Sequence, residues 1–230
     1  MIAILADVHG NYPALKAVLD EIDSLGCKTI ISLGDVAGYY CMINECIREM
    51  RSRNIINLMG NHDSYLVSNK RCPRSNSANY CLKYQEKIIF KENLEWLRNS
   101  RPSLLLDGIS FVHGGWADPV DEYLYEITSD YFSGKKGSYF VSGHTHVQVL
   151  AKLKHQIYCN PGSVGQPRDG DRRAAYAIYN HGIFTLKRVD YNIDVIALEM
   201  ENAKFEPYYY QNLFIGSRIG GTFSAVTVGG

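Results

Sequence analysis

The chain has 230 residues, a length that fits a single domain burying roughly 70% of the surface of its unfolded chain. Its 24 lysines and arginines balance its 24 aspartates and glutamates, so no overall field draws it to nucleic acid or to an anionic membrane. It opens without a basic leader and has no apolar run near the ~18 residues of a membrane helix. The cysteine spacing is unsuited to a disulfide framework. We therefore expect a cytoplasmic location.

The first part of the chain alternates short apolar runs with amphipathic stretches, the pattern of a layered α/β fold. Asn11 and Pro13 are expected to open a helix that Gly26 closes, and residues 43–50 carry the apolar stripe of a second helix. Buried strands flank these helices at residues 2–6, 29–33 and 55–59. The predicted order is β-α-β-α-β.

Residues 64–101 are expected to be mainly helical, and strands dominate afterwards. Turn sequences such as Asp107-Gly108 and Asn180-His181-Gly182 indicate hairpins between some of these strands. The strands are predicted at 104–106, 109–112, 139–142, 147–153, 156–159, 174–179 and 183–189. They predict a second, mostly antiparallel sheet, with a helical segment over 193–215 after it.

The domain organisation predicted from these elements is simple. No internal repeat divides the sequence, so residues 1–215 are interpreted as one domain. The Gly- and Ser-rich residues 216–230 are interpreted as a C-terminal tail that is frayed or bound to a partner.

Five of the predicted strands run directly into short polar clusters, which together hold five of the seven histidines. Loops that leave neighbouring strands converge on one edge of a sheet, so these clusters are expected to meet there. The clusters are Asp7-Val8-His9-Gly10-Asn11, Gly34-Asp35, Gly60-Asn61-His62-Asp63, His113-Gly114 and Gly143-His144-Thr145-His146. The other two histidines, His155 and His181, are expected to be ordinary surface residues in turns.

Imidazole, carboxylate and amide oxygen together suit a divalent metal such as Mn, Fe, Zn or Ni. Asp7 and His9 stand two residues apart, as do His144 and His146, and on extended backbone both members of such a pair reach one centre. Seven candidate ligands exceed the needs of one tetrahedral ion but suit two ions ~3.5 to 4 Å apart. With two aspartates and a bridging hydroxide the centre keeps a charge of about +1, which would attract phosphate.

In this order the motifs Asp-x-His, Gly-Asp, Gly-Asn-His-Asp, His-Gly and Gly-His-Thr-His resemble the calcineurin-like metallophosphoesterase superfamily. Residues 160–168, Asn-Pro-Gly-Ser-Val-Gly-Gln-Pro-Arg, and the first motif, Asp-Val-His-Gly-Asn, are similar to its small bacterial and archaeal phosphodiesterase branch. The resemblance implies a four-layer α-β-β-α sandwich of two mixed sheets flanked by helices, with a two-metal site on one edge. The implied ligands are Asp7, His9 and His146 for the first ion, Asn61, His113 and His144 for the second, and Asp35 between both.

The resemblance also implies a reaction, the one-step hydrolysis of a phosphoester by in-line attack of a hydroxide that bridges the metals. His62 would not bind metal but would assist the leaving group, work that suits an imidazole with a pKa of ~6.5. A small-molecule or nucleotide phosphodiester is the expected substrate, with a dinucleoside polyphosphate or a monoester as alternatives. Phosphoprotein phosphatases have an acid and an arginine soon after the bridging aspartate, where this chain has Gly38-Tyr39-Tyr40, so a protein substrate is not expected.

Two residues are candidate substrate contacts. Arg168 follows the Asn-Pro-Gly-Ser loop, and a guanidinium binds phosphate through two parallel hydrogen bonds. Asn11 belongs to the first polar cluster. Tyr39 and Tyr40 fit buried packing better than stacking against a nucleobase.

Two other functions are weighed against a small-molecule hydrolase. A non-catalytic interaction scaffold on this fold would be expected to have lost ligands, whereas all of the implied ligands are present here. A nuclease would be expected to carry a basic stripe, which the neutral charge argues against. The expected cofactors are thus two divalent ions, manganese among the candidates, and the expected partner is a small phosphoester. A homo-oligomer remains open.

Overall fold

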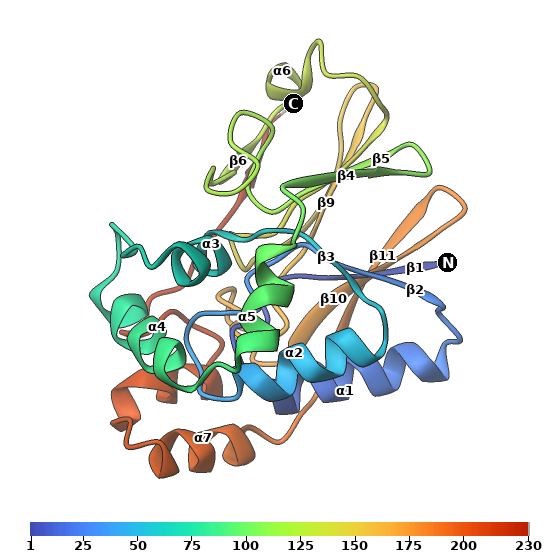
Figure 1. Cartoon of the computed structure of the whole chain (residues 1–230). Helices are drawn as coiled ribbons and strands as arrows, with labels where there is room; N and C mark the ends of the chain where they lie inside the picture. The colour runs from blue at the N-terminus through green and yellow to red at the C-terminus, as the bar shows by residue number, and fades with distance from the viewer. Residues whose placement is uncertain (230) are drawn as a thin grey trace.

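Two five-stranded mixed sheets lie at the centre of the fold, and helices flank them (Figure 1). This computed structural model describes residues 1–229. The observed architecture confirms the predicted α/β sandwich of two mixed sheets flanked by helices. The sheets matter for function because five of their strands end beside the polar clusters identified in the sequence.

The first sheet contains, in spatial order, β11 (Ile183–Val189), β10 (Ala174–Asn180), β1 (Ile2–Leu5), β2 (Thr29–Ser32) and β3 (Ile56–Asn57). Strands β1, β2 and β3 run parallel, and helices α1 (Tyr12–Ser24) and α2 (Ile43–Ser52) connect them. This confirms the predicted β-α-β-α-β order. Asn11 caps α1, because its side-chain oxygen accepts a hydrogen bond from the Ala14 backbone N–H at 3.3 Å.

The second sheet contains, in spatial order, β4 (Ser103–Leu106), β5 (Ile109–Val112), β7 (Tyr139–Val141), β9 (Ile157–Pro161) and β8 (Gln148–Lys152). The outer pairs, β4-β5 and β8-β9, are antiparallel, and the two inner pairs are parallel. The prediction of one mostly antiparallel sheet that includes residues 174–189 was therefore wrong. β10 and β11 pair instead with β1. The run of five buried residues from Ala174 to Ile178 is typical of a strand covered on both faces, as β10 is in the first sheet.

The remaining helices cover the outer faces of the two sheets. Helices α3 (Asn61–Ser68), α4 (Asn76–Ile88) and α5 (Lys91–Arg98) fill the region predicted to be helical, and each packs a leucine against the core of α1 and α2. Helix α7 (Ile193–Asn202) and two short 3-10 turns pack beside α4. Over the second sheet lie the one-turn helix α6 (Ser129–Phe132) and a ribbon of β6 (Glu126–Ile127) with β12 (Thr227–Val228).

Alternate residues of β1 join the two main cores. Ala3 and Leu5 belong to the core that α1 and α2 form on the first sheet. Ile4 points the other way, into the core between the sheets, where Phe111 and Val141 also lie. Successive side chains of a strand point to opposite faces, so one short strand fixes both layers. Asp7 follows its last residue, Leu5, after a single alanine, which ties the position of the site to this packing.

Every helix of residues 1–229 is too short or too polar to cross a lipid bilayer. All six cysteines are free and buried, which places their thiols among the packed side chains.

We expect Ile4→Ala to lower the free energy of unfolding by about 3 kcal/mol, since it removes a fully buried side chain between two sheets and leaves a cavity. Urea denaturation followed by circular dichroism measures the change. The matched control is Ile183→Ala, whose side chain is 68% exposed and for which we expect a change below about 0.5 kcal/mol. Equal effects of the two substitutions would contradict the described packing.

Candidate metal centre

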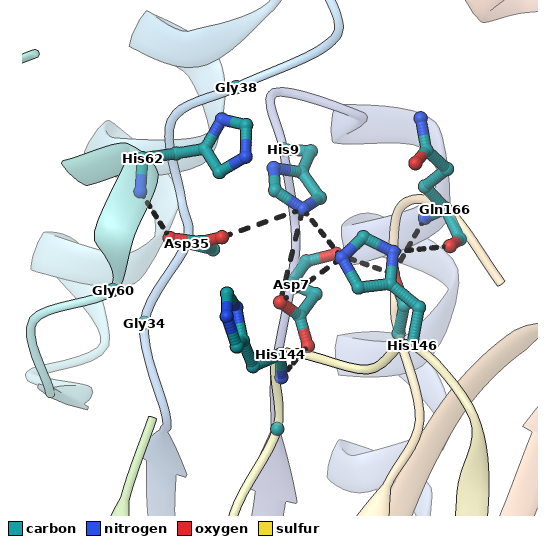
Figure 2. Close-up of polar contacts among 12 residues, drawn as sticks. Asp7, His9, Gly34, Asp35, Gly38, Gly60, His62, His144, His146 and Gln166 are labelled. Atoms are coloured by element: carbon teal, nitrogen blue, oxygen red, sulfur yellow. Dashed lines mark hydrogen bonds and ion pairs between the residues drawn. The ribbon is translucent and has the colours of Figure 1, made fainter. Parts of the chain in front are cut away.

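The polar clusters that follow β1, β2, β3, β5 and β7 meet at one edge of the two sheets. Asn61 and His62 form the first turn of α3, and the other predicted ligands lie in loops. Figure 2 shows the imidazoles of His9, His144 and His146 turned toward the carboxylates of Asp7 and Asp35. Loops separated by more than a hundred residues in sequence thus contribute to one buried cluster.

Asp7, His9 and His146 form a first group able to hold a metal ion. The Nε2 atom of His146 lies 3.3 Å from Asp7 Oδ1 and 3.0 Å from His9 Nε2. His9 Nε2 is 3.9 Å from the same carboxylate oxygen. These three side chains are the set that the family resemblance implied for a first ion.

Asp35, His113 and His144 form a second group of the same kind. His113 Nε2 lies 3.5 Å from Asp35 Oδ2 and 3.1 Å from His144 Nδ1. The side-chain oxygen of Asn61 is 3.3 Å from His113 Nε2, which places the amide beside this second group. Asp35 Oδ2 is also 3.8 Å from His9 Nε2 of the first group, so this carboxylate lies between the two.

The unpaired atoms of the cluster fit divalent cations. Asp7 Oδ1 and Asp35 Oδ2 are buried and accept no hydrogen bond among the described residues. Burying a carboxylate oxygen without a partner is costly, and a cation coordinated by it removes that cost. The donor set of imidazole nitrogen, carboxylate and amide oxygen suits a divalent transition metal.

Hydrogen bonds outside the cluster orient three of the four histidines. In each of the three, Nδ1 faces a backbone carbonyl. His9 Nδ1 lies 2.7 Å from the Ala37 carbonyl, and His113 Nδ1 lies 3.1 Å from the Leu33 carbonyl. His146 Nδ1 lies 2.7 Å from the Gln166 carbonyl. A carbonyl only accepts, so each Nδ1 donates its proton, and in the neutral ring each Nε2 has a lone pair that faces the centre.

His144 has the opposite orientation. Its Nδ1 faces His113, and its Nε2 is 3.6 Å from the Asp121 carboxylate. Its own backbone N–H donates to Asp7 Oδ2 at 3.0 Å, which connects the loops that carry the two groups.

The backbone of the ligand loops differs from the expectation. Asp7, His9, Asp35, His144 and His146 have φ between 52° and 68°, in the left-handed region. The predicted extended backbone at these pairs was therefore wrong, although Asp7 and His9 do belong to one group. His144 and His146 face separate groups, because left-handed turns redirect each side chain. Strained backbone of this kind is held by the surrounding structure and is frequent at functional sites.

Burial and neighbouring charges set the ionisation of the cluster. Burial lowers the pKa of His9, His144 and His146 well below the usual value, which favours the neutral imidazoles that a metal requires. Burial alone would also lower the pKa of His113, but the Asp35 carboxylate outweighs it and raises that pKa to about 9. Burial opposes ionisation of Asp35, yet the histidines around it, His113 above all, hold the pKa of Asp35 well below its usual value.

Asp63 supports the site, a role that was not predicted from the sequence. Its Oδ2 accepts hydrogen bonds from the backbone N–H of Asp35 at 2.8 Å and of Gly60 at 3.3 Å, and its Oδ1 accepts from Ala37 at 2.8 Å. The carboxylate thus fixes the loop that carries Asp35 to the start of α3. An acid at the third position of a helix is the signal that identifies such a cap in a sequence.

His62 lies beside both groups and is 4% exposed. Its ring packs against Tyr39 at 5.0 Å and against His9 at 4.9 Å between centroids, and these contacts orient it. Its Nδ1 has no hydrogen-bond partner among the described residues. Burial lowers the pKa of His62, and the charge of Asp35 opposes that shift.

Arg168 lines the same cavity as His62, a space of about 360 Å³ next to the metal groups. Its guanidinium donates to Gln166 Oε1 at 2.6 Å and to the Tyr39 hydroxyl at 3.1 Å. Tyr39 is therefore buried beside Arg168 and His62, whereas Tyr40 accepts a hydrogen bond from Gln166 deeper in the fold.

The second candidate substrate contact, Asn11, is engaged within the protein. Its amide nitrogen donates to the Gly165 carbonyl at 2.9 Å and to the Tyr191 hydroxyl at 3.1 Å, while its oxygen caps α1. These contacts occupy both amide protons. A contact of Asn11 with substrate stays a prediction.

Comparison with known proteins identifies the family of this chain. Residues 1–181 match the family model described as the calcineurin-like phosphoesterase superfamily domain. The match covers most of the chain and contains all seven predicted metal ligands. The chain therefore belongs to the calcineurin-like phosphoesterase superfamily.

Several relatives are similar over most of their length. An uncharacterised protein of Methanocaldococcus jannaschii is 32% identical, over 94% of this chain and 98% of its own. A phosphodiesterase of the same archaeon is 23% identical, over 70% of this chain and 82% of its own. The crystal structure of a metallophosphoesterase from Sphaerobacter thermophilus is 29% identical, with a TM-score of 0.83 over 94% of this chain and 99% of that one.

We expect Asp63→Asn to weaken divalent metal binding by about 10- to 100-fold, the usual effect of removing a group that orients a ligand. The amide would place N–H donors against backbone N–H groups that now donate to the carboxylate. Competition titration with a metal indicator measures the affinity. Asp20→Asn, on an exposed part of α1, is the control and should bind metal like the wild type. Wild-type affinity in the Asp63 variant would contradict the supporting role.

Proposed function

We propose that this protein is a phosphodiesterase that depends on two divalent metal ions. One observation carries the proposal, namely the two buried groups of aspartate and histidine that adjoin at Asp35. Groups placed this way suit the two-metal clamp that stabilises the attacking and leaving oxygens of an in-line displacement at phosphorus.

Seven residues would hold the ions: Asp7, His9 and His146 the first, Asn61, His113 and His144 the second, and Asp35 both. When bound, the ions supply Lewis acidity for phosphoryl oxygens and hydroxide at neutral pH. The protein contributes rigid, largely neutral ligands, so little reorganisation is needed during the reaction. Manganese is the first ion to test, with iron, zinc and nickel as alternatives.

His62 and Arg168 would act on the substrate itself. Both line the cavity beside the ligands, and neither belongs to the two groups. Arg168 would donate hydrogen bonds to a non-bridging phosphoryl oxygen, since charge-assisted bonds of this kind are the strong ones. His62 would stabilise the departing oxygen by a hydrogen bond or a proton.

A diester is favoured over a monoester for two reasons. The cavity of about 360 Å³ extends from the ligands to residues of α4 and of the C-terminal end, which leaves space for a second substituent on phosphorus. The 23% identical relative from Methanocaldococcus jannaschii is named a phosphodiesterase.

The rival interpretation is a scaffold without activity. Such a scaffold would not need unpaired carboxylate oxygens in a buried cluster.

We expect Asp35→Asn and His144→Gln each to remove a metal ligand. Each should therefore reduce metal affinity by more than the ~10- to 100-fold that is typical when a residue that only orients a ligand is lost. Hydrolysis of bis(p-nitrophenyl) phosphate should be lost with the metal, and chelation of the wild type should have the same effect. Metal content is measured by mass spectrometry, with Asp20→Asn as the control. Undiminished turnover in a metal-loaded ligand variant would contradict the mechanism.

We expect His62→Gln to lower kcat by about 10²- to 10⁴-fold for esters with poor leaving groups, the range for loss of a general acid. The effect should be smaller for p-nitrophenolate, which leaves without much assistance. A series of aryl and alkyl thymidine 5′-phosphodiesters measures this dependence on the leaving group. If the loss is the same across the series, His62 does not act on the leaving oxygen.

A further inference from the structure

Residues 216–229, here called the C-terminal segment, form part of the cavity wall. The Gly170 N–H donates to the Gly216 carbonyl at 3.0 Å, and the Ser224 N–H donates to the Arg168 carbonyl at 2.7 Å. Further along, strand β12 pairs with β6 in the two-stranded ribbon that lies over the second sheet. In Figure 1 this segment, coloured red, runs up to the outer layer of that sheet. The segment therefore joins the loop that carries Arg168 to the ribbon over the second sheet.

The segment brings a second arginine, Arg218, into the lining of the cavity that contains His62 and Arg168. Arg218 is half-buried, and its guanidinium donates to the Ser224 hydroxyl at 2.9 Å and to the Tyr125 hydroxyl at 2.6 Å. The composition of residues 216–230 gave no signal for this role, because a single arginine in a Gly- and Ser-rich stretch is ordinary.

Neither Arg168 nor Arg218 has an anionic partner within residues 1–229. All the hydrogen bonds that these two guanidiniums make there go to neutral oxygens of Gln166, Tyr39, Ser224 and Tyr125. Arg168 is only 5% exposed, so its charge is also poorly solvated. A third arginine of the cavity, Arg74, differs because it pairs with the Asp121 carboxylate. The cavity thus holds two cations that lack a counter-ion.

The two unpaired arginines are linked through Ser224, whose N–H donates to the Arg168 carbonyl and whose hydroxyl accepts from Arg218. Arg168 adjoins the first metal group, since its backbone N–H donates to the His146 carbonyl at 3.2 Å. Arg218 is reached from the second group through stacked rings. Tyr123 stacks on His144 at 3.7 Å and on Tyr125 at 5.3 Å, and Tyr125 bonds Arg218. Arg218 itself bonds only Ser224 and Tyr125 among the described residues, and neither belongs to the metal groups, so an anion that it binds would be a second group of the ligand.

We infer that Arg218 binds a second phosphate group of the substrate, while the metal groups and Arg168 hold the phosphate that is cleaved. The inference rests on the proposed function and narrows it to phosphoesters with two phosphates. A guanidinium fixed by neutral partners keeps its remaining N–H groups for an anion and needs little ordering when one arrives. The C-terminal segment is on this view part of the substrate site.

The test compares two chromogenic diesters that differ in one group, thymidine 5′-(p-nitrophenyl phosphate) and the same compound with a 3′-phosphate. The wild type, loaded with manganese, should have the lower KM for the 3′-phosphorylated ester. We expect Arg218→Gln to reduce this preference, the ratio of the two KM values, by about tenfold, which corresponds to ~1.4 kcal/mol for one charge-assisted contact.

Two further variants separate charge from structure. Arg218→Lys keeps the positive charge and should retain part of the preference. Arg48→Gln removes an arginine from the exposed face of α2, where its side chain is 70% exposed, and should keep the full preference. If Arg218→Gln changes both KM values by the same factor, Arg218 serves only to anchor the segment and the inference is wrong.

A binding measurement keeps the inference separate from the proposed activity. Isothermal titration calorimetry of the manganese-loaded protein compares thymidine 3′,5′-bisphosphate with thymidine 5′-monophosphate. If the wild type binds the bisphosphate more tightly and Arg218→Gln abolishes the difference, the second phosphate site is supported, whether or not the esters are hydrolysed. Failure to hydrolyse either ester would overturn only the proposed activity. Equal binding of the two nucleotides to the wild type would overturn the inference.

Discussion

The burial of two carboxylates among four imidazoles is the constraint on which the site depends. Asp7 and Asp35 each keep one oxygen that is buried and has no hydrogen-bond partner among residues 1–229. Such an arrangement is unfavourable for an apo protein, because desolvation of a carboxylate costs several kcal/mol per charge. A divalent cation between those oxygens and the neighbouring lone pairs offsets the cost. The carboxylate oxygens that destabilise the metal-free protein therefore also favour the binding of a metal ion.

The surrounding loops serve to hold that unfavourable cluster in place. Backbone carbonyls fix three of the imidazoles, and Asp63 fixes the loop of Asp35. Glycine is required where backbone and ligand come close. A Cβ atom on Gly38 would lie 2.1 Å from His9 Nδ1, and one on Gly60 would lie 2.1 Å from Asp35 Oδ1. Precision at the ligands thus depends on residues that never contact a metal.

Much of this arrangement could be predicted from the sequence, and the failures have physical causes. Apolar periodicity located the first three strands and two helices, and the polar clusters after the strands predicted where the ligands meet. Periodicity does not specify strand partners, so the pairing of β10 with β1 was missed. Spacing along the chain also does not reveal a left-handed residue, which is why the backbone at His144 and His146 was expected to be extended. Arg218 was missed because only tertiary contacts bring it to the cavity.

The place of β1 in the first sheet has a consequence for how the protein is made. On one side β1 pairs with β2, close in sequence, but on the other side Ile2 pairs with Tyr179, far along the chain. During synthesis that second edge stays unpaired until residues 174–180 leave the ribosome. Non-local pairing of this kind slows folding, and an open edge invites association with other chains. That edge of β1 therefore stays exposed to other chains until β10 closes the sheet.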